Sequence, residues 1–451
     1  MHKHTMTKYN KLTLAAAAVA ATLACTTTTA LAQSADALID KLVDKGILSV
    51  KEANDLREES DKGFTTAYSV KNGMPEWVTA LKFNGDFRGR YESFSYENGT
   101  TPDRSRFRYR ARFGVTAMLK DNFEVGIRLG SGDVDGGVPT GGIDPISQNQ
   151  TFQNNASKKG IFLDLAYGKW TPLNTPEWTG SVTAGKMENP FVFPSTLMFD
   201  KDYTPEGAAL ELAWRANDHH TLKFTGAGYV LDELGADSND PFVMAAQLRW
   251  DALWSSHFSS SLGVSLWDLV APENLGTAAV PNIGSGNTRT AGGALVNDYR
   301  PVQVDAALTY TMDKFPLYPV AFPITAFGEY MHNPGASDRN NAYTLGLTFG
   351  KSGKKGTWDL SYQYRNLEGD AWYEEFTESD FGANYLTAPT GGSTGYRPGT
   401  NLRGSILRAQ YSPYDALTLG VTYWLTDLIN ESPAGSKSGA GRLQVDAVLK
   451  F

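Results

Sequence analysis

The chain has 451 residues, of which 20% are charged and 12% aromatic, and it carries a formal net charge of -8. This acidic balance argues against a nucleic-acid-binding protein, which needs a basic surface. The mean hydropathy is -0.34, and beyond the N-terminus no apolar run approaches the ~18 residues that would span a bilayer as a helix, which excludes a helical membrane protein.

The first 32 residues have the features of a secretory signal peptide. Three lysines precede an apolar, alanine-rich run over 12–24, which is too short to span a bilayer. The small-x-small sequence at 30–32 predicts cleavage there, so that the mature chain begins at Gln33. The alternative is lipoprotein processing at Cys25, which is disfavoured because Thr22 occupies a position that favours a branched aliphatic residue.

Residues 33–76 have a different pattern from the rest of the chain. Apolar residues recur at helical spacing from Leu38 to Val43, and Ser49 and Glu52 have the spacing of a capping box. We predict a short periplasmic helical segment here. A coiled-coil or wall-tethering element is the alternative, although two short helices contain few heptads.

From Trp77 onward the sequence alternates between apolar and polar residues with a period of two. The clearest example is 104–120, where apolar side chains such as Phe107 and Phe113 alternate with arginines. In the segment 160–171, we assign Ile161, Leu163, Leu165 and Tyr167 to the outer face. Sixteen such segments are predicted, over 78–95, 104–120, 122–131, 160–171, 179–187, 207–216, 219–231, 241–253, 256–268, 300–312, 320–331, 341–350, 356–367, 401–411, 416–427 and 441–451.

The connections between these segments alternate in length along the chain. Short turns are expected at 120–122, 217–218, 255–256, 351–356 and 412–415, and long connections at 132–159, 188–206, 269–299, 368–400 and 428–440. A β-sandwich or solenoid has no reason to alternate in this way, whereas membrane barrels have short periplasmic turns and long extracellular loops. We therefore predict an all-β fold over 77–451, a 16-stranded antiparallel transmembrane β-barrel in contact with outer-membrane lipid.

The final segment, 441–451, places five apolar side chains on one face and ends in Phe451. A strand between lipid and water requires this pattern. We predict that Phe451 is the C-terminal signal read by the barrel-assembly machinery, and that this strand closes the ring beside the first one.

The polar faces of about 16 strands would enclose a water-filled lumen rather than a packed core. The candidate pore-lining residues are a basic ladder on the first two strands: Arg88, Arg90, Arg104, Arg106, Arg108, Arg110 and Arg112. This ladder has two interpretations. The ladder gives a partial anion preference, or Asp86, Glu92 and loop acids neutralise it and leave a generic polar lining.

The connection at 188–206 is unusually apolar for an extracellular loop. Folded into the lumen, its aromatic side chains could pack on the wall. We predict that it forms a constriction, with Asp200, Lys201, Asp202 and Glu206 as further pore-lining residues and its carboxylates facing the arginines.

Three stretches and the terminal Phe451 resemble the bacterial outer-membrane porins, and more narrowly a putative-porin family. These stretches are the signal peptide, the segment DKGILSVKEANDL at 44–56 and the segment GKMENPFVFPSTLMFDKDYTPEGAAL at 185–210. The resemblance implies a 16-stranded, usually trimeric diffusion channel in the Gram-negative outer membrane, whose third loop folds inward.

The sequence shows no catalytic constellation, metal motif or cofactor motif, and we expect none of these. The four histidines beyond the signal peptide fall at turns or strand ends. We therefore predict a passive porin for small hydrophilic solutes and ions, not an enzyme. The alternatives are a substrate-specific channel, and a plugged barrel with a structural or enzymatic role.

Overall fold

The computed structural model describes residues 74–97, 102–132, 146–235, 238–276, 285–382, 399–430 and 437–451. The chain divides into two units, Met1–Gly73 and Met74–Phe451. The predicted signal peptide and residues 33–73 of the predicted helical segment lie outside the described residues. In the part that is described, no helix has the length and apolar character needed to cross a membrane.

The described residues of the second unit form one antiparallel sheet of seventeen strands. Sixteen are long, and β4 has only two residues. The strands are β1 (Val78–Tyr96), β2 (Arg104–Leu119), β3 (Phe123–Gly132), β4 (Gln150–Thr151), β5 (Gly160–Asn174), β6 (Trp178–Lys186), β7 (Glu206–Asn217), β8 (His220–Val230), β9 (Phe242–Leu253), β10 (Phe258–Val270), β11 (Val302–Met312), β12 (Phe322–His332), β13 (Asn341–Gly350), β14 (Trp358–Leu367), β15 (Leu402–Tyr414), β16 (Leu417–Leu428) and β17 (Ala440–Lys450). Among the described residues, two short 3-10 helices, η2 (Lys120–Asn122) and η3 (Pro272–Gly276), lie in connections.

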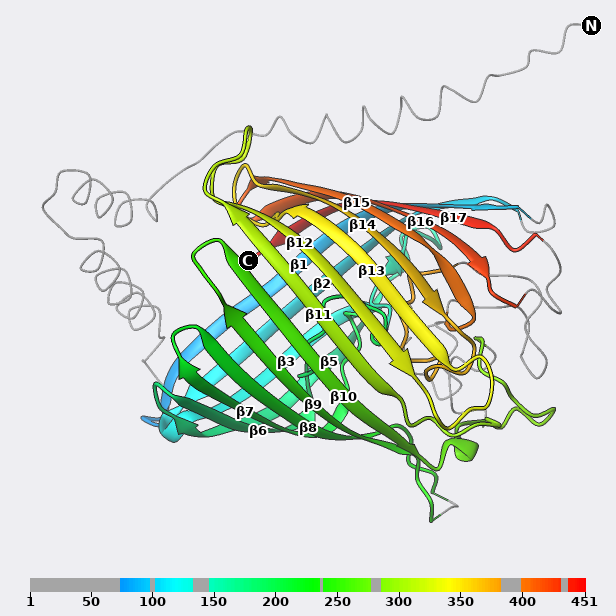
Figure 1. Ribbon diagram of the computed structural model, residues 1–451, viewed down its shortest axis with the longest axis horizontal. Coiled ribbons are helices and arrows are strands. Elements are labelled where there is room, and N and C mark those ends of the chain that lie inside the picture. The colour runs from blue at the N-terminus through cyan, green and yellow to red at the C-terminus, as the bar shows by residue number, and fades with distance from the viewer. Residues whose placement is uncertain are drawn as a thin grey trace, which may run out of the picture. The chain divides into compact units, whose positions relative to one another are not determined.

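The sheet closes into a barrel because β1 pairs with both β2 and β17. Asp86 of β1 lies opposite Arg112 on one side and Lys450 on the other. The remaining long strands pair with their neighbours in chain order, and the tilted strands form a continuous wall (Figure 1). This confirms the predicted 16-stranded antiparallel barrel, and the strand ends agree with the predicted segments to within three residues.

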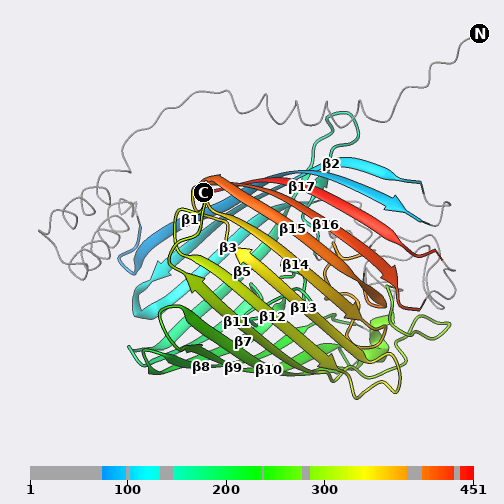
Figure 2. The same cartoon turned by 45° about the horizontal axis from the view of Figure 1, so that its top comes forward.

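Long connections and short turns lie at opposite ends of the barrel (Figures 1 and 2). The β2–β3 turn shows how the sequence makes a short one. Asp121 and Asn122 have φ values of 60° and 61°, the left-handed region that these two residue types tolerate better than most. A tight reversal of the chain therefore needs no glycine here.

Along β2, outward and inward side chains alternate as the sequence predicts. Phe107 and Phe113 are 55% and 46% exposed on the outer face, whereas Arg108 and Arg110 point inward and are buried. In a barrel of this kind, the apolar side chains on the outer face contact lipid, and the polar side chains on the inner face contact water in the lumen.

The predicted outer face of the segment 160–171 is wrong over its second half. Leu165 is buried, and the hydroxyl of Tyr167 donates a hydrogen bond to the inward-facing Glu124 across 2.6 Å. The cause is a β-bulge between β3 and β5, where the register changes between Arg128 and Leu129. A bulge inserts one extra residue and exchanges the two faces beyond it.

Candidate functional site

The inward face of β1 and β2 carries a dense row of arginines. In the β1–β2 register, Arg88 lies opposite Arg110 and Arg90 lies opposite Arg108. Like charges directly opposite each other in a sheet repel and destabilise the pair. The arrangement therefore requires nearby carboxylates.

Glu92 supplies one of these carboxylates from within β1 itself, and its side chain is fully buried. It accepts hydrogen bonds from Arg106 Nε at 2.5 Å and from Arg442 Nη2, on β17, also at 2.5 Å. Arg108 Nη1 lies 3.7 Å away, and Gln444 Nε2 donates a further hydrogen bond at 2.9 Å. Three arginines from two strands thus share one carboxylate.

Asp86 and Asp446 compensate the other end of the ladder. Asp86 forms ion pairs with Arg110 at 3.0 Å and with Arg112 at 2.5 Å. Asp446 of β17 pairs with Arg90 at 2.7 Å. The wall strands β1, β2 and β17 therefore contain acids of their own for most of the ladder.

The β6–β7 loop, residues 187–205, enters the lumen and brings Asp202 to the ladder. Asp202 Oδ1 lies 2.7 Å from Arg110 Nη1 and 3.3 Å from Arg112 Nη1. Lys201 beside it is exposed and lines a lumen cavity together with Asp202, Arg110 and Arg112. The structure thus brings together Asp202, Lys201 and most of the predicted ladder.

Among the described residues, three predicted pore-lining residues take no part in these ion pairs. Asp200 does not face the arginines but bonds to the β14–β15 loop through the amide and hydroxyl of Ser379, at 2.8 and 3.0 Å. Glu206 is exposed at the start of β7 and pairs with Lys186 at 3.1 Å. Arg104 is exposed at the first position of β2, beyond the ion-paired part of the ladder.

Sequence reasoning missed Asp380, which comes from the β14–β15 loop. Its carboxylate accepts hydrogen bonds from Arg442 Nη2 at 2.7 Å and from Gln444 at 2.9 Å, and it lies 3.5 Å from Arg90. Burial on its own would raise the pKa of Asp380, but Arg442, Arg90 and Arg88 hold that pKa well below its usual range. The aromatic and acidic run from Trp372 to Phe376, unusual for an exposed loop, was the available signal.

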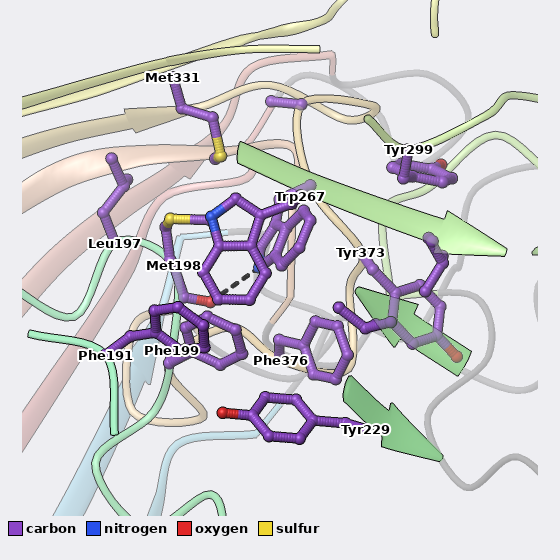
Figure 3. Close-up of a cluster of buried hydrophobic side chains, with 14 of the residues drawn as sticks. Phe191, Leu197, Met198, Phe199, Tyr229, Trp267, Tyr299, Met331, Tyr373 and Phe376 are labelled. Atoms are coloured by element: carbon purple, nitrogen blue, oxygen red, sulfur yellow. Dashed lines mark hydrogen bonds between the residues drawn. The ribbon is translucent and has the colours of Figure 1, made fainter. Parts of the chain in front are cut away.

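The two inward loops meet in an apolar cluster inside the barrel (Figure 3). The ring of Phe199, on the β6–β7 loop, lies 5.1 Å from the ring of Trp267 and 5.2 Å from that of Phe376, between centroids. Leu197 and Met198 are fully buried, as is Trp372. Apolar packing of this extent fixes the conformation of both loops.

Polar contacts join the same two loops. Arg365 of β14 donates a hydrogen bond to Thr196 at 2.7 Å and pairs with Glu378 at 2.9 Å. Burial raises the pKa of Asp200 to about 8, and the charges of Asp202 and Asp380 add to this shift. Asp200 therefore contacts the other loop largely as a neutral carboxyl group at neutral pH.

The β10–β11 connection supports this assembly from the side of the long loops. Arg289 and Glu374 form an ion pair of 2.6 Å in which both side chains are fully buried. The Asn287 amide donates hydrogen bonds to the main-chain oxygens of Gly369 and Trp372, at 2.6 and 2.7 Å. Three connections that lie far apart in the sequence are thus packed into one unit.

Two cavities in the lumen meet at the tip of the β6–β7 loop. One, of about 580 Å³, is lined by the ladder and by both inward loops. The other, of about 720 Å³, extends to residues at the short turns, such as His219 and Lys351. Phe193 and Pro194 line both cavities, so this tip lies between the two parts of the lumen.

The lining of the first cavity contains six basic and six acidic side chains. The basic ones are Arg88, Arg90, Arg110, Arg112, Lys201 and Arg408, and the acidic ones are Glu188, Asp200, Asp202, Glu378, Asp380 and Asp446. The cavity is therefore highly charged while being close to neutral in total. Such a lining favours hydrated polar solutes over apolar ones.

A protein-family model described as "Putative porin" matches residues 95–273 and 212–451 of this chain. Among solved structures, the chain is similar to Salmonella typhi OmpF in complex with daunomycin, at 12% identity over 82% of this chain and 98% of that one, with a TM-score of 0.47. It is similar to Pseudomonas putida OprB at 11% identity over 83% and 98%, with a TM-score of 0.48. It is also similar to the outer-membrane channel DcaP of Acinetobacter baumannii at 12% identity over 85% and 99%, with a TM-score of 0.43. No curated protein matches.

Proposed function

The chain belongs to the putative-porin family and is an outer-membrane channel for passive diffusion, and we propose that its passage narrows at the tip of the β6–β7 loop. The observation that carries this proposal is that Phe193 and Pro194 line both cavities of the lumen. A solute that crosses from one cavity to the other passes these two side chains. The β14–β15 loop packs against the constricting loop and limits its movement.

Selection in such a channel rests on solute size and on the field of the charged lining, without covalent chemistry. The family and fold point to a transport channel rather than an enzyme. The ion pairs of Glu92, Asp86 and Asp202 with the arginines support a largely neutralised lining. We therefore expect the ladder as a whole to order water and solutes across the passage, with little net preference for anions.

The proposal extends to export and assembly. Residues 1–32 would direct the chain across the inner membrane, and the assembly machinery would read Phe451 during insertion into the Gram-negative outer membrane. Main-chain hydrogen bonds between Phe451 and Gly85, of 2.9 and 3.1 Å, support a role for this residue in closing the ring. By the family resemblance, we propose a homotrimer.

Planar-bilayer recording with the purified full-length protein tests this function. We expect stepwise current increments in simple salts. Neutral sugars that are small enough to enter the passage should reduce the current, and sugars too large to enter should reduce it less. Absence of any conductance from folded protein would contradict the proposal and favour a plugged barrel.

A substrate-specific channel is the second candidate. Phe193, Phe327 and Trp424 line the ladder cavity and offer apolar surface beside the charges. Strong block of the current by a single solute class would favour this candidate over general diffusion.

A further inference from the structure

Among the described residues, two of the six cations that line the ladder cavity have no carboxylate partner. Within the part of the chain that the structure describes, neither Arg88 nor Lys201 has a carboxylate oxygen within 4 Å, although both line the ladder cavity. Arg88 Nη2 donates a hydrogen bond of 2.7 Å to the side-chain oxygen of Asn149, which is neutral. Its Nε is buried and has no acceptor among the described residues.

The other basic residues of this cavity are paired. Arg90 pairs with Asp446 at 2.7 Å and with Asp380 at 3.5 Å. The remaining pairs, each of 3.3 Å or less, are Arg110 and Arg112 with Asp86 and Asp202, and Arg408 with Asp359. Arg88 is therefore the ladder residue of this cavity whose charge is not compensated by direct contact.

The acids of the same cavity are already engaged. Asp202, Asp380 and Asp446 contact ladder arginines. Glu378 pairs with Arg365, and Glu188 pairs with Arg128. Asp200 accepts hydrogen bonds from Ser379 and from the Asp202 amide. Within this cavity, the positive charges that no carboxylate contacts are therefore those of Arg88 and Lys201.

We propose that Arg88 and Lys201 form a binding subsite for a small oxyanion, a carboxylate or phosphate group, within the channel lumen. This inference rests on the proposed channel function. It concerns one point of a lining that is otherwise neutralised, so it is compatible with a small net preference for anions in simple salts. A guanidinium offers two parallel donors that match the oxygens of either group, and an ammonium adds a point charge with rotatable donors. The cavity of about 580 Å³ admits a small organic anion together with water.

The two cations come from elements of different kinds, which shapes how the subsite would act. Arg88 is on the wall strand β1, whereas Lys201 is on the β6–β7 loop. Phe193 and Pro194 line the same cavity, so a solute bound by these two cations would lie on the ladder side of the constriction. Such binding must be weak, because a channel conducts only when its sites release what they bind.

Block of the chloride current in planar bilayers tests the subsite. Inorganic phosphate and succinate serve as the two oxyanion probes, and glucose serves as the neutral one. We expect both oxyanions to reduce the wild-type chloride current. Arg88→Gln and Lys201→Gln should each raise the half-blocking concentration about threefold, the effect of one unit charge across a water-filled gap of several ångströms.

Two variants separate this effect from general changes in the lumen. Arg88→Lys keeps the charge and should retain block close to the wild type. Lys82→Gln removes a cation from β1 at a residue outside the lining of the ladder cavity and should leave block unchanged. Block by phosphate alone would assign the subsite to phosphate groups, and block by succinate alone would assign it to carboxylates.

Conductance without oxyanion block, or equal block in the wild type and Arg88→Gln, would overturn the subsite while leaving the channel function intact. Line broadening of the phosphorus NMR signal of phosphate by detergent-solubilised protein gives a readout that needs no current. Broadening that the Arg88→Gln variant loses is expected even if the reconstituted channel is closed. Unchanged broadening in that variant would also contradict the proposal.

Discussion

Trp372 Nε1 donates a hydrogen bond of 3.0 Å to the main-chain oxygen of Met198, and this buried bond joins the β14–β15 loop to the β6–β7 loop. The two loops start from strands that are eight positions apart in the barrel. Each loop therefore reaches into the lumen from a different part of the wall. Together they form a single packed unit on which the position of the constriction depends.

Trp372→Ala should loosen this unit. Loss of a fully buried tryptophan side chain typically costs about 3–5 kcal/mol, and here the loss falls on loop packing while the strand pairing stays intact. We expect a higher and noisier single-channel conductance from a barrel that still forms. Recordings of single channels check this, with heat-modifiable migration on gels as the measure of barrel folding.

Trp372→Phe is the matched control for the hydrogen bond. It keeps an aromatic ring in the cluster and removes the donor to Met198, for which we expect a cost of about 1 kcal/mol. Its conductance should lie close to the wild type. If Trp372→Ala conducts like the wild type, the two loops do not restrain each other.

Asp200, which bonds to Ser379 of the β14–β15 loop, makes the contact between the two loops sensitive to pH. Burial raises its pKa to about 8 from the ordinary aspartate value of 3.8. Two carboxylates face it and raise the pKa further: Asp202 on its own loop and Asp380 on the opposite loop. Because the folded state keeps this proton to a higher pH, its stabilising contribution is complete below about pH 4 and is lost as the pH rises through about 8.

We therefore expect the constriction to loosen between about pH 6 and about pH 9. Open-channel current noise, recorded at both pH values, measures the change. Asp200→Asn keeps an oxygen that can accept the hydrogen bond from Ser379 and cannot ionise, so its noise should be independent of pH in this range. The same pH step in the wild type and the variant would assign the change to another group.

Among the carboxylates that pair with the ladder arginines, Glu92 is the most buried. Substituting it tests how much these ion pairs contribute to the stability of the barrel. Glu92→Gln leaves Arg106, Arg108 and Arg442 without their shared charge. Removing one partner of a buried ion pair commonly costs about 3–5 kcal/mol. We expect a lower urea midpoint for unfolding, and Glu92→Gln combined with Arg106→Gln should recover part of the loss. A midpoint equal to the wild type would show that water already solvates these arginines.

The strands of this fold could be predicted from the sequence because successive side chains face lipid and the lumen in turn. Apolar and polar residues therefore alternate along each strand with a period of two. The bulge before Leu165 could not be predicted, because it depends on the register with β3 rather than on the local pattern. It moves Leu165 and Tyr167 from the outer to the inner side.

The candidate site was predicted only in part, for the same physical reason. Strand alternation determines that the wall arginines Arg88 to Arg112 point inward, and the apolar composition of the β6–β7 loop indicates that it is buried. The position of Asp380 depends on contacts between loops more than 170 residues apart, such as Trp372 with Met198. Local sequence carries no information on such pairing, which is why Asp200 was assigned to the arginines and Asp380 was missed.

Phe451 allows assembly and selectivity to be separated. Its main chain exchanges hydrogen bonds with Gly85, and its ring stacks on Phe113 at 6.5 Å between centroids. Deletion of Phe451 removes both interactions at the seam between β17 and β1, yet leaves every lumen charge in place. We expect less folded protein in the outer membrane, measured by heat-modifiable migration, and an unchanged reversal potential for the channels that do form.

Leu449→Ala, which trims an exposed outer side chain of the same strand, should assemble nearly normally. Normal levels of folded protein after deletion of Phe451 would count against its role as the insertion signal.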